Sequence, residues 1–462
     1  MVYNFNLTNL RGPFFLMNDE TDKFSLKRDL GFFPALSTVM GLVIGGGVFF
    51  KISSVTAATG SASLTIVVWL LAGFITINAG LTVAELASAL PVAGGIYKYI
   101  EYIYGKVPAF LLAWAQSVIY YPAGISALSI IFATQVMNLC NIANKWQIPI
   151  AISLAIFMYL VNLLGAKVGG RIQSISLIAK LIPIILIIVV GIFTPTNNPI
   201  SLFPVTAGSH TSFWSSLGGG LLATMFAFDG WMNVGNLAGE MKKPEKDLAK
   251  SIIIGLFAIT LIYVLISFVF IKALPFATIP GNQNAASESA IRIFGNIGGK
   301  IVTIGILISV FGSVNGYTMT GPRVSYVLGV DDEIVFSKFF SKLTKNSRVP
   351  ANAGLIQTII AIIMIFMGSF DFLTDMLVFV MWIFSMMMFI GVFILRKNEP
   401  ELERPYMIHF YPIPPLIALA GGGYIIISTL LRQPVLAFTG IGITLLGLPI
   451  YYIHYFNKKR SL

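Results

Sequence analysis

One lysine lies inside a long apolar segment. Lys180 is the only charged residue of the stretch 172–192. Counted from Arg171, it lies about 14 Å along a helix that rises about 1.5 Å per residue, close to the middle of a hydrocarbon layer about 30 Å thick. An ammonium group at that depth is costly unless protein groups bind it, and such a residue marks a functional site by default. The sequence therefore predicts a functional role for Lys180.

Two other apolar segments are interrupted near their centres. Gly45-Gly46-Gly47 interrupt the segment 31–52, and Phe-Ala-Phe-Asp-Gly at 226–230 interrupts the segment 213–238. Because a break frees backbone N–H and C=O groups, it must face protein or a water-filled cavity. Free N–H groups at a helix start suit a carboxylate, and free carbonyls at a helix end suit an ammonium group. Two facing breaks can therefore bind both ends of a zwitterion such as an α-amino acid.

The same residues have simpler explanations. Consecutive glycines also let a neighbouring helix pack closely, and we expect the Asp229 side chain, next to Gly230, to cap the second half of its helix. The position of the breaks favours binding. They fall in the first and sixth apolar segments. Because these segments are five spans apart, an odd number, the sixth segment crosses the membrane in the opposite direction to the first. Interrupted helices at matching positions of two inverted halves are typical of transporter sites.

The composition predicts an all-α polytopic membrane protein. The chain is 56% hydrophobic and 11% charged, whereas a soluble protein has about 25% charged residues. About twelve apolar segments of roughly 18 residues or more recur along the chain. We predict transmembrane helices over 31–52, 64–90, 108–137, 148–165, 172–193, 213–238, 249–272, 297–322, 351–369, 371–395, 413–431 and 434–454.

The placement of charge predicts the orientation. With the N-terminus in the cytoplasm, about 23 of the 30 Lys and Arg residues fall on the inner side, as the positive-inside rule requires. We therefore expect a multi-pass protein of the cell membrane with both termini cytoplasmic. The net charge of +11 then reflects topology, and we expect no nucleic-acid partner.

Cysteine and histidine usage argues against metal sites. The single Cys140 excludes an internal disulfide and a cysteine-ligated metal, and the three histidines are scattered. We expect no metal and no cofactor. The sequence has no arrangement of nucleophile and base, so we do not expect an enzyme. Glu85 and Glu240, at inner helix ends, are expected to pair with inner-loop cations such as Lys242, Lys243 or Arg323.

Eight segments, in order, carry a resemblance to a known family. They are IGGGVFF (44–50), AELASALPVAGGIYKYIEYIYG (84–105), RIQSISLIAKL (171–181), FAFDGW (226–231), GEMKKPEKDL (239–248), FGSVNG (311–316), Arg404-Pro405 and GLPIYY (447–452). Together they resemble the amino acid–polyamine–organocation superfamily, within it the L-amino acid transporter family, and most of all its bacterial alanine–serine–cysteine exchangers.

The resemblance covers nearly the whole chain and implies its organisation. The implied fold is a five-plus-five inverted repeat like that of the bacterial leucine transporter, followed by two more helices. We accordingly expect these parts: 1–30, a cytoplasmic N-terminus; 31–193, the first five-helix repeat; 213–395, the second, inverted repeat; 413–454, helices 11 and 12; 455–462, a cytoplasmic C-terminus.

The resemblance also implies the substrate site. The N–H groups around Gly45, Gly46 and Gly47 would hold the carboxylate, and Phe226 would cover the substrate as an aromatic gate. Four carbonyls would take the amino group, those of Val43, Phe226, Ala227 and Asp229. The expected substrate-binding residues are Val43, Ile44, Gly45, Gly46, Gly47, Phe226, Ala227, Phe228 and Asp229.

Lys180 matches a lysine that the family carries in its fifth span. In sodium-coupled relatives a cation lies between spans 1 and 8, and Lys180 could place its ammonium group there. Ser313 and Asn315, or a freed carbonyl of span 1, are the expected partners. The alternative is a purely structural lysine that bonds to backbone carbonyls.

The implied activity is sodium-independent exchange of small neutral L-amino acids such as alanine, serine and cysteine, by alternating access. Two alternatives stay open. A proton-coupled symporter would protonate and deprotonate Lys180 in each cycle, and the Asp229 carboxylate could favour cationic amino acids. A channel would need rings of like residues or a repeated filter loop, and the sequence has neither.

Two departures from the family pattern concern partners and the carboxylate site. Gly46 stands where many relatives have serine, which leaves only backbone donors at that position. Cys140 lies closer to a helix end than the heavy-chain disulfide of animal relatives requires. We therefore expect no heavy-chain subunit, only the amino-acid substrate and the lipid bilayer.

Overall fold

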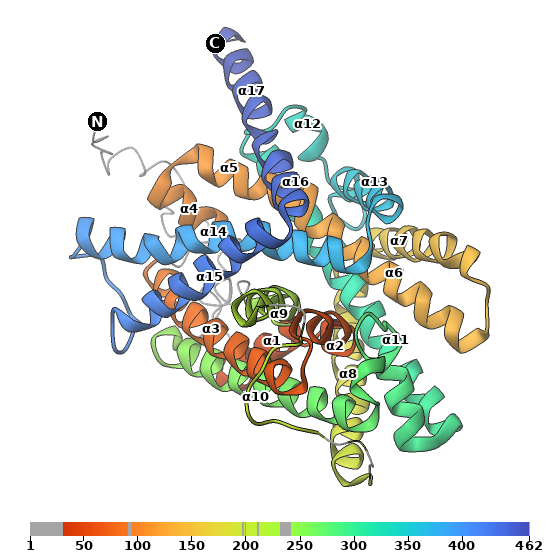
Figure 1. Cartoon of the computed structure of the whole chain (residues 1–462). Helices are drawn as coiled ribbons and strands as arrows, with labels where there is room; N and C mark the ends of the chain where they lie inside the picture. Colours follow the sequence, from red (N-terminus) through yellow and green to blue (C-terminus); the bar gives the residue numbers. More distant parts are fainter. Residues whose placement is uncertain are drawn as a thin grey trace.

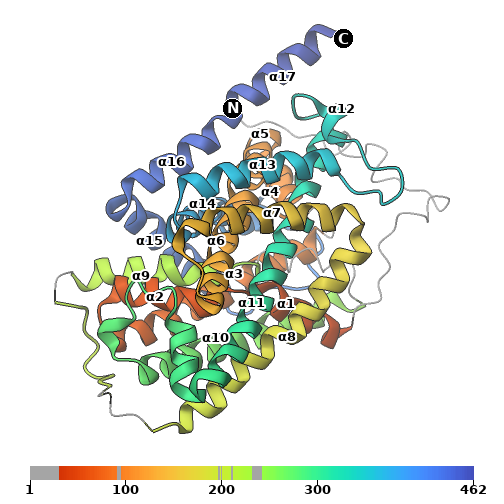
Figure 2. The same ribbon diagram turned by 90° about the vertical axis from the view of Figure 1, so that its right-hand side faces the viewer.

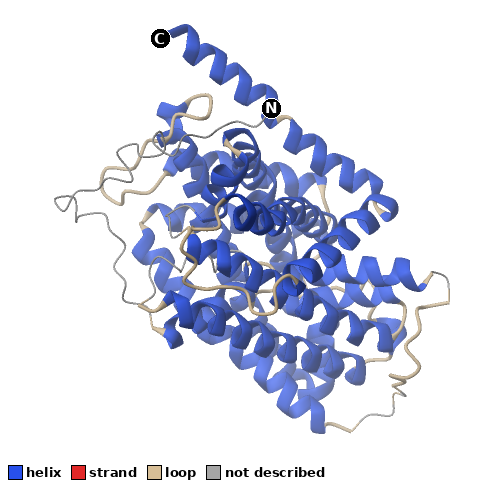
Figure 3. Ribbon diagram, turned by 90° about the vertical axis from the view of Figure 1, so that its left-hand side faces the viewer, coloured by secondary structure: helices blue, strands red, loops and turns tan. Residues whose placement is uncertain are grey.

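The computed structural model describes residues 31–461 except 91–94, 196–197, 199, 210–211 and 232–241. Within these ranges the chain forms helices joined by loops, with no β-strand (Figure 3). The all-α prediction is confirmed. The helices are α1 (Phe32–Val43), α2 (Gly47–Thr59), α3 (Ala62–Ala89), α4 (Gly95–Tyr104), α5 (Lys106–Ala115), the π-helical turn η2 (Gln116–Tyr120), α6 (Tyr121–Cys140), η3 (Asn144–Trp146), α7 (Gln147–Leu163), α8 (Ala166–Phe193), α9 (Phe213–Ala227), α10 (Pro244–Ala273), η5 (Phe276–Thr278), α11 (Ala285–Val330), α12 (Ser337–Phe340), α13 (Ala351–Met367), α14 (Phe370–Asn398), α15 (Ile413–Arg432), α16 (Pro434–Leu445) and α17 (Gly447–Ser461).

The apolar segments become membrane-spanning helices. In the described part of the chain, nine helices are long and apolar enough to cross a bilayer, and α9 and α13 are shorter apolar helices. The interrupted pair α1–α2 coincides with the first predicted segment. Each predicted segment thus falls largely on helix. The main exceptions are the predicted interruptions, at 44–46 and 228–231, and the end of 213–238 lies outside the described residues. The protein is an all-helical, multi-pass membrane protein.

The helices that carry the predicted breaks lie at the centre of the bundle. Figure 1 shows α1, α2 and α9 between α14–α15 and α3–α10. α2 packs along α9, and α1 packs along α10. α11 lies against both α8 and α6. This arrangement brings the break at the end of α1, the end of α9 and the middle of α8 to one place.

Two polar contacts brace the bundle away from its centre. The Glu85 carboxylate, 2% exposed, accepts two hydrogen bonds from Arg396, at 2.7 and 2.6 Å, and lies 3.8 Å from Arg404. Arg396 and Arg404 belong to the predicted inner connection between the segments 371–395 and 413–431, so the expected pairing of Glu85 with an inner-loop cation is confirmed, although the partners are not Lys242, Lys243 or Arg323. Glu240 lies outside the described residues. At the other contact, Lys458 lies 2.6 Å from Asp332 and anchors α17, which projects from the bundle (Figure 2).

Candidate functional site

The first helix breaks over three residues. α1 ends at Val43, Ile44 is extended (φ −69°, ψ 103°), and α2 begins at Gly47. The Ile44 N–H still bonds to the Met40 carbonyl at 2.9 Å. The last carbonyls of α1 have no donor, and the first N–H groups of α2 have no acceptor, within their own helices, as at any helix end. Both sets of groups are therefore open to other partners at the centre of the bundle.

The second interruption lies at the end of α9. The helix ends at Ala227, and a turn follows in which the Asp229 N–H bonds to the Phe226 carbonyl at 3.2 Å. The residues that would continue this span, 232–241, lie outside the described part of the chain. The helix that Asp229 was expected to cap is among them, so that expectation stays a prediction.

The two breaks touch each other. A Cβ atom added to Gly47 would lie 2.8 Å from the Ala227 Cα, closer than side chains tolerate, so glycine is required for this approach. The Tyr263 hydroxyl of α10 then joins both helix ends. It lies 3.2 Å from the Val43 carbonyl oxygen and 2.8 Å from the Ala227 carbonyl oxygen. Two of the carbonyls expected to bind an amino group thus share one tyrosine proton.

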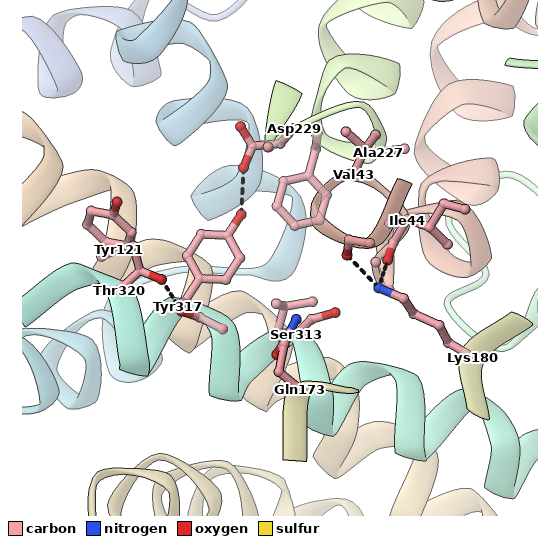
Figure 4. A pocket seen from close by; sticks show the side chains of 18 of the residues that line it. Val43, Ile44, Tyr121, Gln173, Lys180, Ala227, Asp229, Ser313, Tyr317 and Thr320 are labelled. Atoms are coloured by element: carbon pink, nitrogen blue, oxygen red, sulfur yellow. Dashed lines mark hydrogen bonds between the residues drawn. The ribbon is translucent and has the colours of Figure 1, made fainter. Parts of the chain in front are cut away.

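Lys180 reaches the end of α1 from α8. Its side chain is 3% exposed, and its Nζ donates to the Gly41 carbonyl at 2.8 Å and to the Ile44 carbonyl (Figure 4). A freed carbonyl of span 1 was one of the partners predicted from the sequence. The bonds explain how the bundle accommodates a buried ammonium group, because backbone carbonyls at a helix end carry partial negative charge.

The other two expected partners of Lys180 are bonded elsewhere. The Ser313 hydroxyl donates to the Ser309 carbonyl at 3.1 Å, although its side chain does line the cavity with Lys180. The Asn315 amide donates to the Gly169 carbonyl at 3.0 Å and fastens α11 to α8. Among the described side chains, neither residue has a hydrogen bond to Lys180, so the partners of Lys180 in this structure are the carbonyls, and a role of Ser313 and Asn315 in a cation slot stays a prediction.

A cavity of about 130 Å³ lies between the breaks, α8 and α11. On the same measure one water molecule needs roughly 10–15 Å³, so the cavity can hold a small solute. The lining includes all predicted site residues except Asn315 and Phe228, and the Phe228 ring packs on Tyr263 and Trp69 instead. The predicted residues that line it are Val43, Ile44, Gly45, Gly46, Gly47, Lys180, Phe226, Ala227, Asp229 and Ser313.

Asp229 forms an acidic corner of this cavity. Its carboxylate accepts a hydrogen bond from the Tyr317 hydroxyl at 2.7 Å (Figure 4). It accepts a second one from the Tyr120 hydroxyl at 2.6 Å. Within the described part of the chain, no cationic side chain pairs with it. A negative charge bound only by neutral donors in a buried site has a strong preference for a cation or for a further donor.

Several lining residues were not predicted. Tyr120 and Tyr121 belong to the predicted segment 108–137, but the sequence does not show which face of that helix meets the cavity, and Tyr317 and Gln173 gave no signal of their own. Tyr263 was missed despite a usable signal. It is a lone tyrosine in the middle of the apolar stretch 249–272, where a hydroxyl needs a buried partner.

Broken helices around a central cavity, in an all-helical multi-pass protein, define a membrane transporter. The chain matches the amino acid permease family model over residues 30–455, and it belongs to that family. It is 37% identical to the serine/threonine exchanger of Bacillus subtilis over 440 residues, which covers 94% of this chain and 98% of the relative.

More distant relatives match over a similar length. The human cystine/glutamate transporter is 26% identical over 95% of this chain and 87% of its own. The mouse Asc-type amino acid transporter 1 is 26% identical over 95% of this chain and 83% of its own. The relatives are transporters, and the protein is a transporter and not an enzyme.

Proposed function

We propose that the protein is a sodium-independent exchanger of small neutral L-amino acids, such as alanine, serine and cysteine, that works by alternating access. One observation carries the proposal: two broken helix ends face one cavity, and the Lys180 ammonium group binds the carbonyls at one of them. The similarity to a serine/threonine exchanger supports amino acids as substrates.

The substrate would bind through its backbone groups. The first N–H groups of α2, at Gly46 and Gly47, suit the carboxylate, because the positive end of the helix dipole lies there. The Ala227 carbonyl and its neighbours suit the ammonium group. Phe226 lies at the boundary of the cavity, where its ring can cover a bound side chain. The small cavity favours short side chains.

Lys180 would replace a transported cation. A fixed ammonium group at the end of α1 donates hydrogen bonds to the carbonyls that would otherwise bind a metal ion. Transport would therefore require no sodium gradient. The substrate itself would then connect the two breaks and allow the conformational change. Because a carrier without substrate lacks that connection, it would reorient poorly, and transport would be exchange.

The organisation of the chain follows the same proposal. Residues 31–193 and 213–395 form two inverted five-helix repeats, 413–454 adds two helices, and both termini are cytoplasmic in the cell membrane. We expect no heavy-chain subunit.

Exchange in proteoliposomes tests the proposal. Vesicles are preloaded with labelled serine, and efflux is measured into buffer that contains each of the twenty amino acids in turn, with sodium or with choline. We expect external alanine, serine and cysteine to accelerate efflux equally in both salts. Efflux into amino-acid-free buffer at the same rate contradicts exchange. Uphill uptake driven by a pH gradient alone would instead establish the proton-coupled symporter.

The acidic corner supports a second candidate, an exchanger that accepts cationic amino acids. Asp229 lies in the cavity lining and is bound there by the hydroxyls of Tyr120 and Tyr317. A lysine or arginine side chain could pair with this carboxylate. In the same assay, external arginine would then accelerate efflux, and the Asp229→Asn protein would lose this response while it kept the response to alanine. No response to arginine in the unmodified protein rules the candidate out.

A further inference from the structure

A partly buried ion cluster lies close to the cavity but outside its lining. Lys51, on α2, is 0% exposed, and its Nζ lies 2.8 Å from Asp375 and 3.2 Å from Asp371, both on α14. The Ser54 hydroxyl of α2 also donates to Asp371, and the Gln433 amide lies 3.4 Å from Asp375. Lys51, Asp371 and Asp375 are called here the α2–α14 latch. It joins helices whose contacting residues are more than 300 positions apart in the chain.

Aromatic rings connect the latch to the cavity. The Lys51 Nζ lies 5.7 Å from the centre of the Phe226 ring and 5.3 Å from the centre of the Phe370 ring. These two rings meet edge to face at 5.8 Å, and Phe50 meets Phe370 at 6.3 Å. Phe226 also lines the cavity, so its ring connects the cavity wall to the latch.

The cavity continues in another direction, along α11. Its lining runs from Ser313 to Thr320, and a second cavity shares Met319 with it and extends to Arg323. In the proposed orientation, the C-terminal end of α11 faces the cytoplasm. The latch then lies on the external side, where the Asp371 side chain is 40% exposed. In this orientation the arrangement is that of an inward-facing carrier, in which the cavity is closed towards the external side and can be approached from the cytoplasm.

We propose that the α2–α14 latch closes the external route to the cavity and couples that closure to substrate binding. Lys51 follows Gly47 by four residues, about 6 Å along the helix. Movement of α2 away from α14 would therefore alter the proposed carboxylate site and separate the ion pairs together. This inference rests on the proposed alternating access, but not on which amino acid is carried.

The chemistry suits a reversible contact. In the closed form the ammonium and the carboxylates satisfy one another, and in an outward-open form water would hydrate both. In neither form is a buried charge left without a partner. If either the ammonium or a carboxylate is removed by substitution, an unpaired buried charge remains in the closed form only. The simpler explanation is a permanent brace, in which Asp371 also complements the dipole at the start of α14. The two explanations differ in what happens to external access.

A single reporter cysteine measures external access. In a Cys140→Ser background, Ser313→Cys places the only thiol in the cavity lining. Right-side-out vesicles are treated with a membrane-impermeant thiol reagent, and the labelling rate is followed without substrate. We expect Lys51→Met to raise this rate by about tenfold or more, since an unpaired buried charge disfavours the closed form by at least that factor.

Three further variants make the test decisive. The charge-reversed pair Lys51→Asp with Asp375→Lys is expected to bring the rate back towards the parent. Lys106→Met is the control. It removes the 3.0 Å ion pair between Lys106 and Glu333 on the predicted cytoplasmic side of the bundle, and it should leave external labelling unchanged. Asp371→Asn, which weakens the latch at its exposed edge, should raise the rate by a smaller factor.

The outcomes separate the explanations. If Lys51→Met labels at the parent rate, or if the Lys106→Met control accelerates labelling as much, the latch is refuted. If Lys51→Met does not fold, an unchanged rate for Asp371→Asn refutes it. Because labelling needs no amino acid, a faster rate in a protein that fails the exchange assay supports the latch and refutes only the proposed substrate.

Discussion

Replacing Tyr263 with phenylalanine tests the contact between the two breaks. The ring packs 5.5 Å from Trp69 and 5.1 Å from Phe228, and phenylalanine keeps both contacts. Only the hydroxyl is lost. Its proton is shared between the carbonyls of Val43 and Ala227, and the 2.8 Å distance to Ala227 marks the stronger bond.

The size of the effect follows from burial. Removing the donor from a buried acceptor costs about 1–3 kcal/mol. If the Tyr263 bonds form in only one of the two alternating conformations, the same free energy changes their ratio about 5- to 150-fold. We therefore expect the rate of serine exchange to fall by a factor in this range, and the free energy of unfolding to fall by no more than about 3 kcal/mol.

Exchange rates and thermal unfolding are measured on matched proteins. Tyr104→Phe is the control, because the Tyr104 hydroxyl also donates one bond to a backbone carbonyl, that of Met387, at 2.7 Å, but between α4 and α14. It should lose stability without a comparable loss of exchange. If the Tyr263→Phe protein exchanges serine as fast as this control, the hydroxyl has no part in joining the breaks during transport.

Three more outcomes are expected. Lys180→Ala should reduce exchange at least about tenfold, because it leaves helix-end carbonyls without a cation; unchanged turnover and affinity from both sides would rule the proposed role out. Glu85→Gln should lower the free energy of unfolding by about 2–4 kcal/mol, since Arg396 is then left largely unpaired. As a control, Glu288→Gln replaces an exposed carboxylate and should change the free energy of unfolding by less than about 0.5 kcal/mol. Equal melting temperatures of the two variants contradict this prediction. The exposed Cys140 should react with an impermeant maleimide on intact cells, and reaction only after permeabilisation reverses the proposed orientation.

The helices were predictable because lipid imposes a simple rule. Apolar stretches of sufficient length must be helices, and in the described part of the chain every predicted segment is largely helical apart from the two interruptions. The break after Val43 was predictable for the same reason, since three consecutive glycines give little support to a buried helix. The short helices between spans, such as α4, are too polar and brief for that rule.

The partners of individual side chains were harder to predict. Lys180 was identified as a buried cation that needs polar partners within the protein, but the choice between Ser313, Asn315 and the end of α1 depends on how α8 is rotated. Rotation is set by packing and not by the polarity of one span. Ion pairs are harder still: Glu85 and Arg396 are separated by 311 positions, and periodicity within a segment carries no information on such a distance.

The π-helical turn at Gln116–Tyr120 places Tyr120 beside Asp229. Such a turn holds one residue more than a regular helix needs. Because each residue turns an α-helix by about 100°, deleting one residue here would restore regular winding and twist α5 against α6. Tyr120 could then no longer meet the carboxylate while Trp114 kept its 3.0 Å bond to the Ile443 carbonyl. The position of a polar group in the binding cavity thus depends partly on the number of residues in this turn. A deletion of one residue would test this dependence, which substitutions of single residues do not test.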